Sequence, residues 1–245
     1  MIYDIKMDFT RKARLLSEGC RTPNYVTRTY AWVVFRESFR IAFTYAALNG
    51  LDVWAADVQN AFLQAPCSKK YFTVCGKEFG NEFIGKLAII VRAAYGFKST
   101  GADFRNHLRN CMKNLGYEYF KADPDVWMRS STRTAGLVYY EYILLYVDDC
   151  LGIYENLKLE LLQFYKYFPI KPASLRPPKT YLGGTVSNIQ LPNGVYALEF
   201  SSLQYVYEAV KSVELHLEKE GKKLMSKKPG KPIPTSYSPE LDVTP

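Results

Sequence analysis

The acidic pair Asp148-Asp149 interrupts a stretch of the chain that is otherwise almost free of charge. It follows the run LVYYEYILLY, which begins at Leu137, and Val147, and it precedes a second apolar run, CLGIY. Two apolar runs around a polar pair are typical of a β-hairpin, so we expect the two aspartates at its tip. Neither face of this hairpin is polar, which predicts that the hairpin is buried.

A third carboxylate, Asp57, ends the short apolar run at residues 53–56, which is predicted to be a buried strand. A carboxylate at the edge of a core is costly unless it is paired or bound to a cation. If this strand lies beside the hairpin, three carboxylates converge, and oxygen ligands of this kind suit a divalent cation. The alternative is a solvated Asp-Asp turn, since polar turn tips are common in soluble proteins.

Helices and hairpins are predicted around these strands. Apolar side chains recur at helical spacing through residues 37–49, and Asn49-Gly50 supplies a helix stop. Residues 157–168 have the same spacing, whereas residues 64–91 hold short apolar runs punctuated by Pro and Gly, which is typical of hairpins. Strands and helices that alternate in this way favour an α+β fold.

Two further helices are predicted with capping boxes at their starts. Residues 101–115 follow the pair Thr100 and Asp103, and residues 201–221 begin at the pair Ser201 and Gln204. The second helix is amphipathic, so we expect its apolar residues to point inward; these are Leu203, Val206, Tyr207, Val210 and Leu217.

An ordered set of motifs resembles the reverse transcriptases of copia-like retrotransposons. DVQNAF, which begins at Asp57, is similar to their motif A, AAYGFKSTGADF to motif B, and YVDD to motif C. RKARLLSEG, ADPDVWMR and YLGGT match further stretches in the same order, and the resemblance covers roughly residues 10–220. A set of motifs in order is far more specific than any one of them.

The resemblance implies a right-hand polymerase, that is, an α+β fold with fingers, a palm built on an antiparallel sheet backed by helices, and a short thumb. The reverse transcriptase domain would span residues 1–226: fingers about 1–31 and 64–97, palm about 32–63 and 98–190, thumb about 191–226. Residues 227–245 are rich in Pro, Lys and Ser and are interpreted as a linker or tail.

The activity that the resemblance implies is RNA-directed DNA synthesis by two-metal catalysis. Asp57 and Asp148 would hold two Mg²⁺ ions, with the Val58 carbonyl as a further ligand and Asp149 in support; Mn²⁺ would be a substitute. Two alternatives stay open. One is a decayed or repurposed copy that binds nucleic acid without catalysis, and the other is a different metal-dependent phosphotransferase.

The resemblance also assigns binding residues, each of which has a purely structural alternative. The charged side chains of basic residues suit the phosphates of a nucleotide. An aromatic ring against the sugar would exclude a 2′-hydroxyl, so Phe62 implies selection of deoxynucleotides. The predicted nucleotide-binding residues are Lys12, Arg14, Phe62, Tyr95, Gly96 and Lys98. The predicted primer and template contacts are Tyr146, Val147, Leu182 and Gly183. The structural alternatives are a solvated strand edge for the basic residues, a core position for the aromatic ring, and ordinary turns for the segments that contain glycine.

Composition agrees with a globular nucleic-acid-binding protein. With 48% hydrophobic and 23% charged residues the 245-residue chain can bury a sizeable core, and its net charge of +8 favours a polyanionic partner, although a merely basic protein would look the same. The resemblance implies an RNA template, a DNA primer and deoxynucleoside triphosphates as partners. We expect a fragment of a larger polyprotein whose ribonuclease H and integrase domains are absent from this chain.

Compartment and cysteine chemistry are also constrained. No apolar run approaches the roughly 20 residues of a membrane helix, and no signal-peptide core is present, so we expect an intracellular protein that does not bind membranes and is not secreted. The resemblance implies cytoplasmic virus-like particles with access to the nucleus.

Five widely spaced cysteines without a C-x-x-C pair predict no disulfide or zinc site, and Cys150 is predicted to pack beneath the acidic pair.

Overall fold

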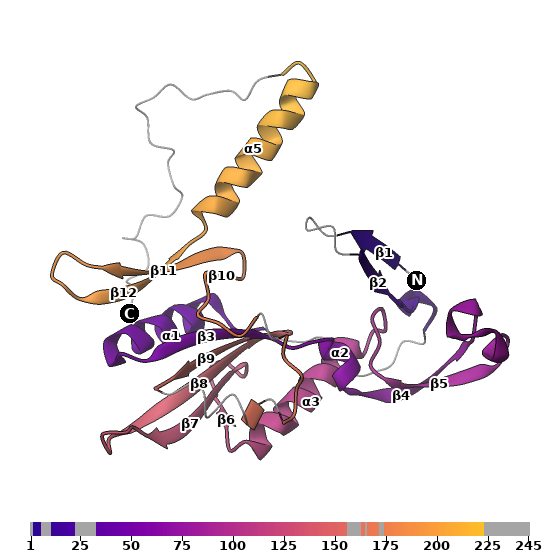
Figure 1. Ribbon diagram of the computed structural model, residues 1–245, viewed down its shortest axis with the longest axis horizontal. Helices are drawn as coiled ribbons and strands as arrows, with labels where there is room; N and C mark the ends of the chain where they lie inside the picture. Colours follow the sequence, from indigo (N-terminus) through magenta and orange to yellow (C-terminus); the bar gives the residue numbers. More distant parts are fainter. Residues whose placement is uncertain are drawn as a thin grey trace, which may run out of the picture.

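The computed structural model describes residues 2–5, 11–22, 33–155, 163–164, 166–171 and 174–222 (Figure 1). Three sequence predictions lie wholly or mostly outside these ranges. They are the helix at residues 157–168, the end of the thumb at residues 223–226, and the tail at residues 227–245. The side chain of Lys12 is also outside the described part of the protein.

A five-stranded antiparallel sheet forms the centre of a mixed α+β fold. Its strands, in spatial order, are β3 (Asp52–Asp57), β9 (Asp149–Tyr154), β8 (Val138–Tyr146), β7 (Val126–Thr132) and β6 (Glu118–Tyr119). The predicted strand that ends at Asp57 is therefore confirmed, and it pairs directly with the second strand of the predicted hairpin.

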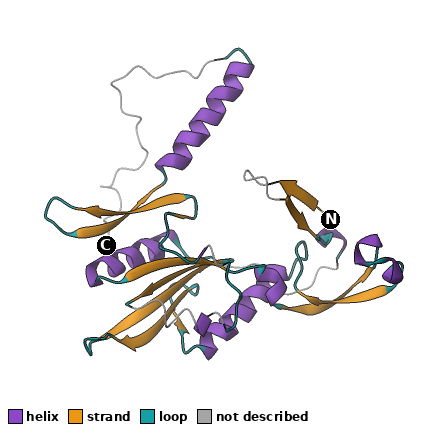
Figure 2. Ribbon diagram, in the orientation of Figure 1, coloured by secondary structure: helices purple, strands orange, loops and turns teal. Residues whose placement is uncertain are grey.

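Both faces of this sheet are covered, which explains why its strands lack a polar face (Figure 2). Helix α1 (Arg36–Asn49) packs on one face through Phe39, Phe43 and Ala46. Helix α3 (Thr100–Asn114) covers the other face, together with the short helix α2 (Ala61–Gln64). Burial of apolar side chains on both sides supplies the main driving force for this arrangement.

The hairpin of β8 and β9 is confirmed, with two corrections. Its two-residue turn is Val147-Asp148, so Asp149 is already the first residue of β9 and not part of the tip. Burial is also incomplete, because Val138 and Tyr140 at the start of β8 are exposed. The charged residue of this strand, Glu141, is fully buried and forms a 2.7 Å ion pair with Arg129.

The three predicted helices that fall in the described ranges form there, but neither predicted capping box forms in full. Helix α1 ends at Gly50, whose φ of 58° is the left-handed conformation expected of a helix stop. Helix α3 begins after Ser99, and the Thr100 hydroxyl instead donates a hydrogen bond to the Ala94 carbonyl. At helix α5 (Leu203–Lys219) half of the box forms: the Ser201 hydroxyl accepts a 3.3 Å hydrogen bond from the N–H of Leu203, but the Gln204 side chain donates to Glu208 instead of reaching back.

The prediction that the apolar face of α5 points inward is wrong. The helix extends away from the rest of the molecule (Figure 1), and none of its described residues is buried. Leu203, for example, is 73% exposed. Amphipathic spacing shows that a helix has an apolar face, but it does not show that the same chain covers that face.

The remaining strands form three smaller antiparallel sheets. They are β1 (Ile2–Ile5) with β2 (Arg11–Arg14), β4 (Pro66–Val74) with β5 (Leu87–Arg92), and β10 (Thr180–Tyr181), β11 (Gly184–Gln190) and β12 (Tyr196–Ser201). The β4–β5 ribbon confirms the hairpin expected in residues 64–91, and it carries the 3-10 turns η2 (Lys77–Phe79) and η3 (Asn81–Phe83) between its strands. A third such turn, η1, spans Gly19–Arg21.

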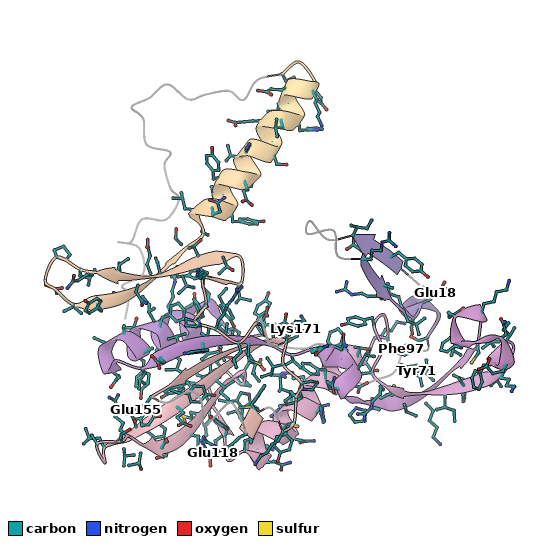
Figure 3. All side chains as sticks on the ribbon, viewed as in Figure 1. Glu18, Tyr71, Phe97, Glu118, Glu155 and Lys171 are labelled. Atoms are coloured by element: carbon teal, nitrogen blue, oxygen red, sulfur yellow. The ribbon has the colours of Figure 1, made fainter. Side chains whose placement is uncertain are left out.

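Contacts between elements fix the position of the β4–β5 ribbon. The ring of Tyr71 in β4 stacks on that of Phe97 with centroids 4.0 Å apart, just before α3 begins (Figure 3).

None of the helices in the described ranges is long and apolar enough to cross a membrane. All five cysteines are free, and Cys150 is buried in β9 directly after the acidic pair, as predicted.

Candidate active site

The ends of β3 and β9 bring the three predicted carboxylates to one edge of the sheet. Asp57 and Asp149 are register partners, so their side chains lie on the same face of the sheet. The backbone N–H of Val58 donates a 2.9 Å hydrogen bond to the carbonyl of Asp148, which fixes the hairpin turn against the end of β3. Residues 57 and 148, far apart in the sequence, are therefore neighbours through these backbone contacts.

Backbone strain is concentrated at this edge. Among the described residues, the only non-glycine residues with positive φ are Asn60 (49°), Val147 (55°) and Leu182 (46°). Left-handed backbone is unfavourable for a β-branched residue such as Val147, and it persists only where surrounding contacts impose it. Such outliers cluster at functional sites, and these three lie beside Asp57, within the hairpin turn and in the turn between β10 and β11.

A segment that follows Phe168 covers the outer edge of β3. Its backbone forms isolated bridges at Val58 with Ile170 and at Ala55 with Arg176. Between these bridges, the N–H of Lys171 donates to the Asp57 carbonyl at 3.0 Å, and the N–H of Asp57 donates to the Ser174 hydroxyl at 2.9 Å. Asp57 is thus held through both its backbone N–H and its backbone carbonyl, which fixes the direction in which its side chain leaves β3.

The side chain of Lys171, which is labelled in Figure 3, forms an ion pair with Oδ2 of Asp57. The other oxygen of that carboxylate, Oδ1, is buried and has no hydrogen-bond partner among the described residues. A buried carboxylate oxygen without a partner is unfavourable, so this position favours a further cation or donor.

Burial and mutual repulsion of the carboxylates change the protonation of the site. Burial, followed by the charges of Asp148 and Asp57, raises the pKa of Asp149 to about 6, while the Lys171 ammonium opposes this rise. Burial, with the same three carboxylates, also raises the pKa of the Cys150 thiol, which stays neutral. The site therefore carries more negative charge than one lysine neutralises.

The donor set is suited to a hard divalent ion, although the side chains are not yet arranged around one. Within the described ranges, no three carboxylate, histidine or cysteine side chains are grouped closely enough to hold a metal ion as they stand. Like charges converge only around a cation, and here the cation beside Asp57 is Lys171. The orphaned Oδ1 of Asp57 and the adjacent carboxylates of Asp148 and Asp149 fit an ion such as Mg²⁺.

A pocket of about 190 Å³ opens beside the carboxylates. Its lining includes Asp57, Asp149, Arg176, Tyr181 and Leu182. Leu182 and Gly183 form the two-residue turn between β10 and β11, and both have positive φ, which is the type I′ hairpin geometry. The tight hairpin expected from YLGG is thus confirmed, and it lies against the acidic edge. Its predicted contact with a primer stays a prediction.

Three of the predicted nucleotide-binding residues contact one another. The ring of Phe62 lies 5.1 Å from that of Tyr95 and 5.9 Å from that of Phe104, so it is partly a core residue. The guanidinium of Arg14, from β2, lies over the other part of this cluster, 5.3 Å from the centroid of the Tyr95 ring. The structure therefore brings a basic strand and the two aromatic residues together, although it does not test their role in binding.

Gly96 and Lys98 have contacts of their own. Gly96 has a φ of 95°, and a side-chain carbon added there would lie 2.0 Å from the Ser17 carbonyl oxygen. Glycine is therefore required at this position by packing against residues 17–19. The ammonium of Lys98 donates a 3.1 Å hydrogen bond to the Thr22 carbonyl. Tyr146, 36% exposed, is the register partner of Asp149. The nucleotide and primer contacts of these residues stay predictions.

Sequence reasoning missed two residues at the acidic edge, Lys171 and Ser174, which hold Asp57. Tyr181, the first residue of the YLGG motif, is buried in the pocket, and its phenol has no hydrogen-bond partner among the described residues. Burial raises the pKa of Tyr181, and the nearby Cys150 and Asp149 add to this effect. The only sequence signal for Lys171 is that it is the first charged residue after the apolar residues Phe168 and Ile170.

Comparison with protein families gives a match over nearly the whole chain. A family model described as reverse transcriptase (RNA-dependent DNA polymerase) matches residues 2–222. This range includes every strand and helix described above. No curated protein matches the chain.

Proposed function

The chain belongs to the reverse transcriptase family, in the form typical of copia-like retrotransposon polyproteins, and we propose that it is an RNA-directed DNA polymerase that extends a primer with deoxynucleotides. The observation that carries this proposal is the register of β3 and β9. It brings Asp57 opposite Asp149, and the hydrogen bond from Val58 holds Asp148 beside them. These are the positions where the motifs of the family place their acidic residues.

Two Mg²⁺ ions, or Mn²⁺ in their place, would be held by Asp57, Asp148 and Asp149, with the Val58 carbonyl as a further ligand. When bound, the ions activate the primer 3′-hydroxyl and neutralise charge on the transferred phosphate groups. The orphaned oxygen of Asp57 supports this assignment, because it is a buried acceptor that no described residue satisfies.

Other residues would position the substrates. Arg14 would contact the triphosphate, with Tyr95 beneath its guanidinium, while Phe62 would limit space at the 2′ position of the sugar. Leu182 and Gly183, in the type I′ turn, would contact the end of the primer. RNA template and DNA primer would supply sequence choice by base pairing, so the protein needs no groups that read bases.

The arrangement of elements supports the expected subdomains. The five-stranded sheet with α1 and α3 falls in the palm range, residues 32–63 and 98–190. The β1–β2 and β4–β5 ribbons fall in the fingers, residues 1–31 and 64–97, while β12 and α5 fall in the thumb, residues 191–226. In the view of Figure 1, α5 and the β1–β2 ribbon both lie above the sheet and apart from each other, as thumb and fingers would.

Primer extension tests this function. The protein is given an RNA template, an annealed DNA primer and deoxynucleotides, with Mg²⁺ or with EDTA. We expect extension only with Mg²⁺, and a loss of at least about a hundredfold in Asp148→Asn and in the double variant Asp148→Asn, Asp149→Asn. These changes keep the Asp148 carbonyl that accepts from Val58, so the fold should be preserved.

Asp52→Asn is the matched control, because it makes the same change at the exposed start of β3 and should leave extension intact. Extension by the double variant would refute the assignment. Primer–template binding by the unaltered protein without any incorporation would support the alternative, a copy that binds nucleic acid but has lost catalysis.

A further inference from the structure

We infer that Lys171 is a built-in counter-cation of the metal site, which holds Asp57 in the metal-free protein and leaves that carboxylate when a divalent ion binds. The inference rests on the proposed role of Asp57 as a metal ligand. It adds a positioning residue that competes with the ion and thereby sets how tightly the free protein binds it.

The backbone around Lys171 is fixed, so its side chain is delivered to Asp57 by the fold. Its N–H donates to the Asp57 carbonyl, and its own carbonyl accepts 2.9 Å and 2.7 Å hydrogen bonds from the N–H and hydroxyl of Ser174. Ser174 in turn accepts from the N–H of Asp57. Lys171, Ser174 and Asp57 therefore form a closed set of contacts at the end of β3.

The ammonium itself is held much less firmly than the backbone. It pairs with only one oxygen of Asp57, and the Lys171 side chain is 49% exposed. Solvent screens such a pair, and water can replace the lost hydrogen bond when the side chain moves away. The Asp57 side chain is 29% exposed, with Oδ1 buried, so an incoming ion would meet a carboxylate that is already oriented.

Charge balance explains why the protein would need this lysine. Asp57 and Asp149 are register partners, and the hydrogen bond from Val58 holds Asp148 beside them, so three carboxylates lie at one edge and repel one another. Without metal, Lys171 is the cation that pairs with a carboxylate in the described part of this edge. A divalent ion replaces one positive charge by two, so binding removes the need for the ammonium.

Competition of this kind has a measurable consequence. Because Lys171 and a bound ion would share the Asp57 carboxylate and repel each other, removal of the ammonium should make the free protein bind metal more tightly. We expect Lys171→Met to lower the dissociation constant for Mn²⁺ about two- to fivefold, the range of a solvent-screened ion pair. A lysine with only a structural role would give the opposite result or none.

Mn²⁺ binding is measured by electron paramagnetic resonance of the free ion, without nucleic acid or nucleotide. Lys171→Arg keeps the charge and should stay near the unaltered protein. Lys121→Met is the matched control, because it makes the same change at an exposed position beside β6, the opposite edge of the sheet. In an Asp57→Asn background the effect of Lys171→Met should disappear, since the carboxylate for which lysine and metal compete is gone.

A second readout is thermal stability. In EDTA, Lys171→Met should melt at a lower temperature than the unaltered protein, and Mn²⁺ should raise its melting temperature by more. Unchanged or weaker Mn²⁺ binding by Lys171→Met would overturn the inference, as would an equal gain in Lys121→Met. These results are separable from the proposed function: tighter binding without primer extension would contradict polymerase activity alone, whereas extension with unchanged Mn²⁺ affinity would contradict the role of Lys171 alone.

Discussion

Asp57 and Asp149 are register partners at the ends of two antiparallel strands, and their carboxylates lie on the same face of the sheet. In a folded protein this pairing is unfavourable unless a cation accompanies it. Lys171 supplies one positive charge at this edge, and a buried oxygen of Asp57 is left without a partner in the described structure. The pairing of these two carboxylates therefore lowers the stability of the metal-free protein and provides ligands for a metal ion.

The pH dependence of stability should report this cost. Because the pKa of Asp149 is about 6 in the folded protein and ordinarily near 4, the folded state binds more protons between these values. Stability in EDTA should therefore fall as the pH rises from about 4 to about 6. Asp149→Asn should reduce this fall by on the order of 2 kcal/mol in urea unfolding, whereas Asp52→Asn should not. An identical fall in Asp149→Asn would contradict the raised pKa.

Phe62 should control the choice of sugar. Replacement by Val removes the ring, so we expect the ratio of ribonucleotide to deoxynucleotide incorporation, measured as kcat/KM, to rise at least about tenfold. The ring also contacts Phe104, so a loss of about 1–2 kcal/mol in stability should accompany the change. Phe62→Tyr keeps the ring and serves as the control. An equal loss for both nucleotides would mean that Phe62 only packs.

Leu182→Asn should stabilise the protein. Leu182 has a φ of 46° at the first central position of a type I′ turn, where Asn followed by Gly is strongly preferred. The side chain is 41% exposed, so little packing is lost, and we expect a gain of about 1 kcal/mol in thermal or urea unfolding. Leu191→Asn is the control, at similar exposure without positive φ. A gain in stability with reduced primer extension would support a functional reason for leucine here.

Neither member of the buried pair Arg129 and Glu141 should be removable alone from the five-stranded sheet. Glu141 is 1% exposed, and it accepts hydrogen bonds from Tyr117 and Tyr139 as well as from Arg129. Arg129→Met leaves this carboxylate without its cation and should cost about 3 kcal/mol in urea unfolding. The double variant Arg129→Met, Glu141→Met should recover most of that loss, because two apolar side chains replace the pair. Equal losses in both variants would contradict this account.

The amino-acid sequence by itself determined the local elements. Continuous apolar runs predicted β3 and the β8–β9 hairpin, the apolar spacing and Asn49-Gly50 predicted α1 and its end, and YLGG predicted a tight turn. These features depend on backbone geometry and on neighbours a few residues away, which a single sequence contains. The order of the acidic motifs also identified the family.

Only the tertiary structure decided which of these elements meet. The register of Asp57 with Asp149, the ion pair with Lys171, and the packing of Gly96 on Ser17 join residues far apart in the chain. The same limit explains the errors at α5 and at the capping boxes, because an apolar face or a capping residue has a partner only if the fold supplies one. Local sequence patterns show which side chains require burial or a hydrogen-bond partner. Long-range packing decides which residues they contact.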